Sequence, residues 1–355
     1  MTHPIRIGLM GVLAAGTGLG AALAAIPGVA WADSSTDPYS WLDQVVSGLS
    51  VPAADAAAPL DMQISISGFD LFPTLDNTAT AESSFGSFAV AIGDGANANA
   101  SGGFLDGAFA DGTNANAGAG LGGNFDLAIA NGDNSNAGAG VGGNFVVAIA
   151  NGNNSDAGAG IGSNFDIATA DGDGSKAIVG IGGGWDIATA EGANSSANAG
   201  LGQFNDATAL GAGSNATAAG NFDSALANGA GSDASAGGGS ADLAIANGAG
   251  VEAIATGNSD TAIVSGTNAE AQAIGVGDIA SIFNTGSAFD QAIAGGTAAA
   301  FSDNNIATII GTGSTAFAGA DGATLGDWDL AAVFGDMLHA SAIGGNFLVD
   351  ILPSI

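Results

Sequence analysis

The sequence predicts an all-β fold in which about thirteen short coils stack into a single-chain β-solenoid, or β-roll. Three observations lead to this prediction. A segment of 18–20 residues repeats along most of the chain, as in GGNFDLAIANGDNSNAGAGV (122–141) and GGNFVVAIANGNNSDAGAGI (142–161). Each copy holds two stretches that alternate with the period of a strand, separated by glycine-containing corners. A unit this short buries a core only by stacking on its neighbours.

The copies align on an Ala-x-Ala-x-Gly core. Their spacing is 18–20 residues in the middle of the chain and 27 and 24 residues at the end. At ~4.8 Å per coil, thirteen coils would form a rod ~60 Å long. The first alanines of the copies are Ala89, Ala108, Ala128, Ala148, Ala168, Ala188, Ala207, Ala225, Ala244, Ala262, Ala280, Ala307 and Ala331.

The first strand of each copy has two different faces. One face carries large apolar residues, such as Phe125, Leu127 and Ile129, and the other carries Asp, Ala, Ala and Gly. We expect the large face to be buried against the small face of the second strand, which holds Ser135 and Ala137, because large against small fills a thin core. The Asp and Ala face would then form a bare outer strip. The alternative puts the alanines inside and the Phe–Leu–Ile face outside, covered by a partner or another segment.

An acidic column precedes the alanines by two residues. It consists of Asp106, Asp126, Asp166, Asp186, Asp223, Asp242, Asp260, Asp278 and Asp329, with Asn205, Asn305, Ser87 and Val146 in the remaining copies. Asp, Asn and Ser all accept hydrogen bonds from backbone N–H groups two residues on, so we interpret the column as tightening each corner. The alternative is a calcium column formed by the aspartates from Asp106 to Asp278.

Known calcium-binding motifs are incomplete in this chain. DGDG (171–174) lacks the distant Glu of an EF-hand loop and is interpreted as a solenoid corner. The GGNF runs do not match the calcium-binding nonapeptide pattern. We therefore predict no catalytic residue, no cofactor-binding residue and no cofactor, with calcium kept as the alternative.

The first 32 residues have the pattern of a secretory signal peptide. A short region containing Arg6 precedes an apolar stretch that ends at Val29, and Ala30-Trp31-Ala32 is a small-x-small cleavage site. An uncleaved membrane anchor is the rival interpretation. Cleavage after Ala32 would leave no stable transmembrane segment.

The rest of the chain divides where its composition changes. Within the N-terminal part, 37–49 could form an amphipathic helix and 60–73 alternates like a strand. The expected divisions are a signal peptide at 1–32, a tether and cap at 33–84, the repeat solenoid at 85–320, and a last coil with a C-terminal cap at 321–355.

Charge and composition exclude several classes of function. The chain has 34 acidic and two basic residues among 355, so nucleic acid and anionic membranes would be repelled. It has no Cys, hence no disulfide framework and no thiolate metal site. After signal removal only Lys176 and His339 remain as basic side chains, which leaves almost no general base. We expect no enzymatic activity.

Two resemblances follow from these residues. FAVAIGDGANANA (88–100) and ATALGAGSNATAAG (207–220) look like the head repeats of trimeric autotransporter adhesins, which form β-rolls. The whole chain resembles exported Gly/Ala/Asn-rich repeat proteins of mycobacteria, through GVAWAD at the signal end, ISISGFDLFPTLDNTATA (64–81) and GGNFLVDILPSI (344–355). Its Gly-rich composition resembles that of PE-PGRS proteins, but without their PE domain. The resemblance implies a secreted or envelope location and no known activity.

We therefore expect a non-enzymatic protein, secreted or on the cell wall or surface, with a structural or surface-interaction role of the adhesin or antigen type. Its partner would be an unknown surface molecule or a second copy of itself. One alternative is a calcium-binding repeat protein that folds on export. Another is an ice- or glycan-binding protein whose flat face combines the alanine strip with Thr169, Thr189 and Thr208.

Overall fold

The computed structural model describes residues 61–71, 77–180, 182–284, 286–296, 304–319, 328–343 and 347–351, the last of these as backbone only. The chain divides into two compact units, Met1–Pro59 and Leu60–Ile355, and all described residues belong to the second. The expected signal peptide and the expected helix at 37–49 therefore lie outside the described residues.

The described residues form two sheets of strands and contain no helix, so none of them builds a helix that could cross a membrane. Sheet A contains, in spatial order, β2 (Phe69–Leu71), β1 (Met62–Ile66), β4 (Phe88–Ile92), β6 (Gly107–Asp111), β8 (Leu127–Asn131), β10 (Val147–Asn151), β12 (Ile167–Ala170), β14 (Ile187–Ala190), β16 (Asp206–Ala209), β18 (Ser224–Asn228), β20 (Leu243–Ala249), β22 (Thr261–Thr267), β24 (Ile279–Asn284), β26 (Ile306–Gly311), β28 (Leu330–Phe334) and β30 (Phe347–Ile351).

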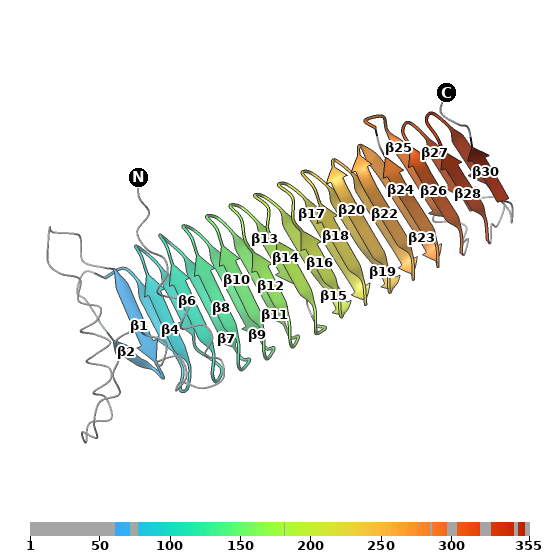
Figure 1. Cartoon of the computed structure of the whole chain (residues 1–355). Coiled ribbons are helices and arrows are strands. Elements are labelled where there is room, and N and C mark those ends of the chain that lie inside the picture. Colours follow the sequence, from blue (N-terminus) through green and yellow to red (C-terminus); the bar gives the residue numbers. More distant parts are fainter. Residues whose placement is uncertain are drawn as a thin grey trace, which may run out of the picture. The chain divides into compact units, whose positions relative to one another are not determined.

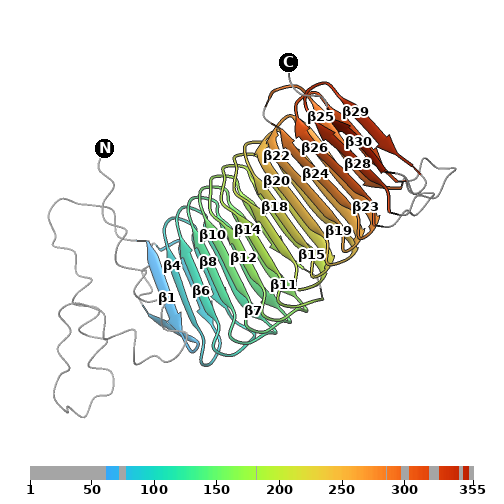
Figure 2. The same ribbon diagram turned by 45° about the vertical axis from the view of Figure 1, so that its right-hand side comes forward.

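Sheet B is built from the strands that alternate with these along the chain. It contains β3 (Thr80–Ser83), β5 (Asn97–Ala100), β7 (Asn116–Leu121), β9 (Asn136–Val141), β11 (Asp156–Ile161), β13 (Lys176–Val179), β15 (Ser196–Gln203), β17 (Asn215–Asn221), β19 (Asp233–Ser240), β21 (Glu252–Asn258), β23 (Ala269–Val276), β25 (Asp290–Gly295), β27 (Thr315–Ala318) and β29 (His339–Ala342). Figure 1 shows the strands following one another from β1 to β30, and Figure 2 shows the same stack after a turn about the vertical axis.

Successive coils pair in parallel and in register. In sheet A, Ala128 lies opposite Ala148, which lies opposite Ala168. In sheet B, Ala137 pairs with Ala157 in the same way. Among the described strands, β1 and β2 depart from this pattern, because β1 pairs antiparallel with both β2 and β4 at the start of the stack. The predicted all-β solenoid of stacked coils is confirmed.

The alanines fill the core, so the expected orientation of the first strand was wrong. Ala128 and Ala130 of β8 are 0% exposed, whereas Phe125 is 42% exposed and Leu127 and Ile129 are partly exposed. The alternative orientation, with alanines inside and the Phe–Leu–Ile face outside, is the one that the structure adopts. The second strand was oriented correctly, since Ser135, Ala137 and Ala139 are buried.

The thinness of the stack explains this arrangement. Each inner wall projects mostly single methyl groups, so the two sheets meet through alanine and leave little room for a Phe or Leu side chain. Towards the C-terminus the core admits somewhat larger residues, with Val264, Ile282 and Ile309 at positions that hold alanine earlier.

In six successive coils, from Ser135 to Ser232, one of the two corners is closed by a buried serine, and we call this side of the stack the serine corner. Ser135 Oγ donates to Gly132 O at 2.8 Å, and Ser155 and Ser175 repeat the bond one and two coils on. DGDG (171–174) belongs to this row of corners, between β12 and β13, as expected.

Candidate functional site

Two corners of each coil use the left-handed backbone conformation, but they are filled by different residues. At the serine corner the residue with positive φ is Asn or Gly from Asn114 to Gly313, as at Asn134 (φ 55°) and Gly174 (φ 69°), and it is Met337 (φ 56°) in the last described coil. Asn and Gly adopt this conformation at little cost. At the opposite corner, which leads into sheet A, the equivalent position is aromatic in six successive coils, at Phe125, Phe145, Phe165, Trp185, Phe204 and Phe222, with φ of 59–66°.

These six side chains form a continuous stack that we call the aromatic ladder. The ring centroids of Phe125 and Phe145 are 4.8 Å apart, and those of Phe145 and Phe165 are 5.1 Å apart, with interplanar angles of 3° and 1°. The following steps, through Trp185 and Phe204 to Phe222, measure 4.5, 6.2 and 4.9 Å. Ring faces are thus turned toward each other along the stack, and the ring edges face solvent.

The ladder is exposed although its residues are large and apolar. Phe165 is the least exposed at 41% and Phe222 the most at 62%. The prediction that these residues lie in the core is therefore wrong. Stacking on neighbouring rings replaces burial in the core as the source of their packing.

Aliphatic residues flank the ladder on both sides. Sheet B ends beside it in a row of exposed side chains: Leu121, Val141, Ile161 and Leu201. On the other side the outer face of sheet A begins with Leu127, Val147, Ile167 and Ile187. Between the first row and the ladder, Asn124, Asn144 and Asn164 bond to one another through side-chain amides at 2.9 and 3.0 Å. We call the ladder and its two aliphatic rows the apolar edge.

Exposed charge is nearly absent from the apolar edge. Within 121–129, 141–149, 161–169 and 182–189 the acidic residues are Asp126, Asp166 and Asp186, and all three are buried. The first exposed acid on this side is Asp206, at the start of β16. The edge is therefore an apolar surface on a chain with a formal net charge of −32.

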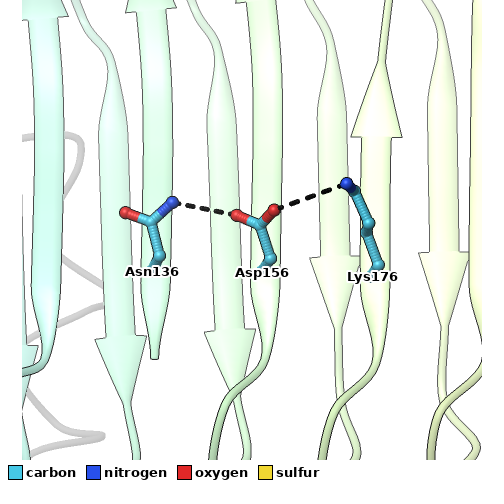
Figure 3. A network of polar contacts seen from close by, with 3 residues as sticks. All are labelled: Asn136, Asp156 and Lys176. Carbon is cyan, nitrogen blue, oxygen red and sulfur yellow. Dashed lines mark hydrogen bonds and ion pairs between the residues drawn. The ribbon is translucent and has the colours of Figure 1, made fainter. Parts of the chain in front are cut away.

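Charged side chains gather instead at the serine corner and on sheet B. The serine corner carries the exposed acids Asp111, Asp133, Asp171, Asp173 and Glu191. On sheet B, Lys176 Nζ lies 3.9 Å from Asp156 Oδ2, and Asp156 Oδ1 accepts a hydrogen bond from Asn136 at 2.9 Å (Figure 3). The serine corner and the outer face of sheet B are therefore charged, whereas the apolar edge carries little charge.

The predicted acidic column is real but lies inside the stack, because the alanine face to which it belongs is the inner face. The eight candidate residues Asp106, Asp126, Asp166, Asp186, Asp223, Asp242, Asp260 and Asp278 are each at most 1% exposed. The expected exposed strip of Asp and Ala was wrong. The flat ice- or glycan-binding face, predicted as an alternative, therefore cannot include the buried alanines. Its other residues, Thr169, Thr189 and Thr208, lie in register on the outer face of sheet A.

From Asp106 to Asn305, the Asp and Asn side chains of the column cap the backbone of the next coil. Asp106 Oδ1 accepts the Asp126 N–H at 3.0 Å, and Asp126 Oδ1 accepts the Val146 N–H at 2.9 Å. Asn205 Oδ1 does the same for the Asp223 N–H at 3.2 Å. Sequence analysis expected the acceptor role but assigned it to an N–H two residues on. The donor in fact comes from the neighbouring coil, so the column links coils.

Burial changes the protonation of these carboxyl groups. It raises the pKa of Asp126 to about 7, and those of Asp186 and Asp242 to about 6, against opposing hydrogen bonds from the next coil. Negative neighbours in the column raise the pKa of each of these three groups further. Burial also raises the pKa of Asp106, Asp166 and Asp223.

The second carboxyl oxygen of several column residues lies in a tight niche made by glycines. A Cβ added at Gly120 would be 1.9 Å from Asp106 Oδ2, and one at Gly140 would be 2.0 Å from Asp126 Oδ2. In the next coil Val146 occupies the same niche beside Gly160. Because a valine methyl replaces the oxygen there, the niche accepts an uncharged group.

The calcium alternative would need several ligands around one ion. In the part of the chain that the structure describes, no group of three or more Asp, Glu, His or Cys side chains is placed to hold a metal. Calcium binding by the column stays an alternative prediction, tested below. His339 is exposed at the start of β29 and bonds to Thr315.

Exposure of the Phe–Leu–Ile face was predicted only as the alternative orientation, and the stacking of its aromatic residues into a ladder was not predicted. A signal for it was present, because the aromatic residue recurs next to a column residue at a corner, where glycine or asparagine is the ordinary choice. Comparison of the chain with protein-family models, with curated proteins and with solved structures finds no match.

Proposed function

We propose that the protein is a non-enzymatic surface-interaction protein, secreted or held in the cell envelope, and that the apolar edge is its contact surface. The observation that carries the proposal is the use of Phe and Trp at left-handed corner positions that Asn and Gly occupy on the opposite side. Backbone strain at an exposed position is a reason to look for function there.

Stability alone is a weak reason to keep these aromatics. The left-handed conformation costs a residue with a Cβ roughly 1–2 kcal/mol. Stacking of one ring pair returns about 0.5–1.5 kcal/mol. The two contributions nearly cancel, so asparagine would serve the corner about as well as phenylalanine. A row of six exposed rings is therefore better explained by contact with another molecule.

The same chain offers little for catalysis. Besides the His339–Thr315 pair and the Lys176–Asp156 pair, basic side chains are lacking from the mature sequence expected after cleavage at Ala32. Both pairs lie in the exposed rows of sheet B. The buried aspartates cap backbone groups and face alanine, which leaves no room for a substrate beside them.

Export is the other half of the proposal and rests on the N-terminal sequence. We expect the mature protein in the medium or the envelope fraction, with an N-terminus at Asp33. Cell fractionation with N-terminal sequencing tests this. An intact N-terminus in the membrane fraction would contradict it.

The contact surface is tested with a triple variant, Phe125→Asn, Phe145→Asn and Phe165→Asn. Asparagine tolerates positive φ, so circular dichroism should stay β-type. The matched control places glycine at the other corner, as Asn114→Gly, Asn134→Gly and Asn154→Gly. Purified proteins are mixed with envelope fragments of the source cells and sedimented. Wild type and control should sediment with the fragments, and the Phe variant should stay in solution. Equal behaviour of all three proteins would contradict the proposal.

A further inference from the structure

We propose that the occupant of the apolar edge is a second copy of this chain, so that two stacks pair through their aromatic ladders. The inference rests on the proposed function, in which the apolar edge is a contact surface, and it names the partner. Three properties of the described residues support a second copy: the placement of charge, the repeat spacing and the size of the surface.

Charge placement permits this pairing despite the large net charge. A chain with formal net charge −32 repels its copies. Apart from Asp206, which is exposed two residues after Phe204, the exposed acids of these coils from Asp111 to Glu191 lie at the serine corner, on the opposite side of each coil. Pairing through the apolar edge therefore brings surfaces with little charge together and keeps the acidic corners apart. Contact through any acid-bearing side would do the reverse.

The repeat spacing favours a copy over an unrelated molecule. Ring edges form ridges separated by 4.5–6.2 Å along the ladder. A second ladder has the same spacing, so its ridges fit between those of the first over many coils. The same patch on both copies would give a self-complementary, two-fold interface.

The area of the edge is close to what a stable interface requires. From Phe125 to Phe222 the ladder spans five coil steps, or ~24 Å at ~4.8 Å each. At roughly 200 Å² for each aromatic side chain, exposures of 41–62% leave ~600 Å² of accessible surface on the six ladder residues. Standard interfaces take about 800 Å² of accessible surface from each partner. The exposed aliphatic residues beside the ladder, such as Leu121 and Ile161, add to this area.

The first arm of the test measures association of the mature full-length protein. Analytical ultracentrifugation over a concentration series should show a monomer–dimer equilibrium for wild type and for the Asn→Gly control. In the Phe125/Phe145/Phe165→Asn variant the dissociation constant should rise at least ~100-fold, because central aromatic contacts dominate interfaces. A wild type that stays monomeric at its highest soluble concentration would overturn the inference.

The second arm uses cysteine cross-linking and does not depend on the folding of the triple variant. The chain has no Cys, so a single introduced thiol reports only its own contacts. Ile161→Cys lies on the apolar edge at 53% exposure, and Ala193→Cys lies exposed at the serine corner. Oxidation should link Ile161→Cys into dimers and leave Ala193→Cys monomeric. The inference would be overturned if Ala193→Cys formed dimers and Ile161→Cys did not. It would also be overturned if association persisted in the Phe125/Phe145/Phe165→Asn variant.

The outcomes separate this inference from the proposed function. If the protein is monomeric but loses envelope binding when the three Phe residues are replaced, the edge is a contact surface for a different partner and only the second-copy inference fails. If association and envelope binding are both unaffected by these replacements, both proposals fail.

Discussion

Asp126→Asn removes one buried carboxyl from the column and leaves its hydrogen bond to the next coil possible. Asp126 lies between Asp106 and Val146, and burial raises its pKa from 3.8 to about 7. That shift of about 3 units corresponds to about 4 kcal/mol of preference for the protonated form in the folded protein. Asparagine fits the position, since Asn205 and Asn305 occupy it in other coils.

The sign of the pH dependence follows from the raised pKa. Between about pH 4 and pH 7 the folded protein keeps a proton that the unfolded chain has released. The stabilisation is therefore complete below the unfolded pKa and is lost as the pH rises through the folded value. Asp186 and Asp242, with pKa values of about 6, add to the loss in the same window.

Urea unfolding at about pH 5 and about pH 8 measures this loss. Wild type should be less stable at the higher pH. Between the two pH values the free energy of unfolding of Asp126→Asn should fall by about 2–4 kcal/mol less than that of wild type. Asp133→Asn, at the exposed serine corner, is the control for removing one acid and should behave as wild type does. The reasoning is refuted if Asp126→Asn loses as much stability as wild type, or if wild type is more stable at the higher pH.

Three further predictions concern the core, the ladder and the column. Ala148→Val, in a core with no spare room, should destabilise the protein by about 1–3 kcal/mol in urea unfolding, whereas Gly138→Ala, which meets no atom within 4 Å on the outer face, should be tolerated; equal effects would contradict the alanine core. Phe145→Asn alone should change the free energy of unfolding by less than about 1 kcal/mol, because lost stacking is offset by relief of left-handed strain; a loss of several kcal/mol would mean that the ring is a core element. The thermal midpoint should rise no more with calcium than with monovalent salt of equal ionic strength; a larger rise would favour a calcium column over backbone capping.

The repeat period and the alternation were enough to predict stacked coils, two strands per coil and the recurring corner residues. They were not enough to orient the first strand, because a period of two leaves either face free to be the inner one. We chose by residue size, which assumes a core thick enough for Phe and Leu. In a stack whose walls meet through methyl groups, size selects against those residues.

Variation within each row was the more informative property. The second strand was oriented correctly because its varied, polar row was placed outside. In the first strand the row that contains Leu127 also contains Asp206 and Ser224, which marks it as the outer row, while Ala128 and its equivalents do not vary. The neighbour that each Asp caps could not be predicted in this way, because it depends on the stacking of coils and not on the order of residues.

Fluorescence of Trp185 tests most directly the claim that the aromatic ladder lies outside an alanine core. In a chain that starts at Asp33 and so lacks Trp31, Trp41→Phe and Trp328→Phe make Trp185, which is 56% exposed, the single indole. Acrylamide quenching is measured on dilute folded protein and on the same protein in urea. We predict quenching in the folded state at a substantial fraction of that in urea, with emission typical of an indole in contact with water. A blue-shifted Trp185 that acrylamide does not reach in dilute solution would contradict the account, because the ladder would then be part of the core.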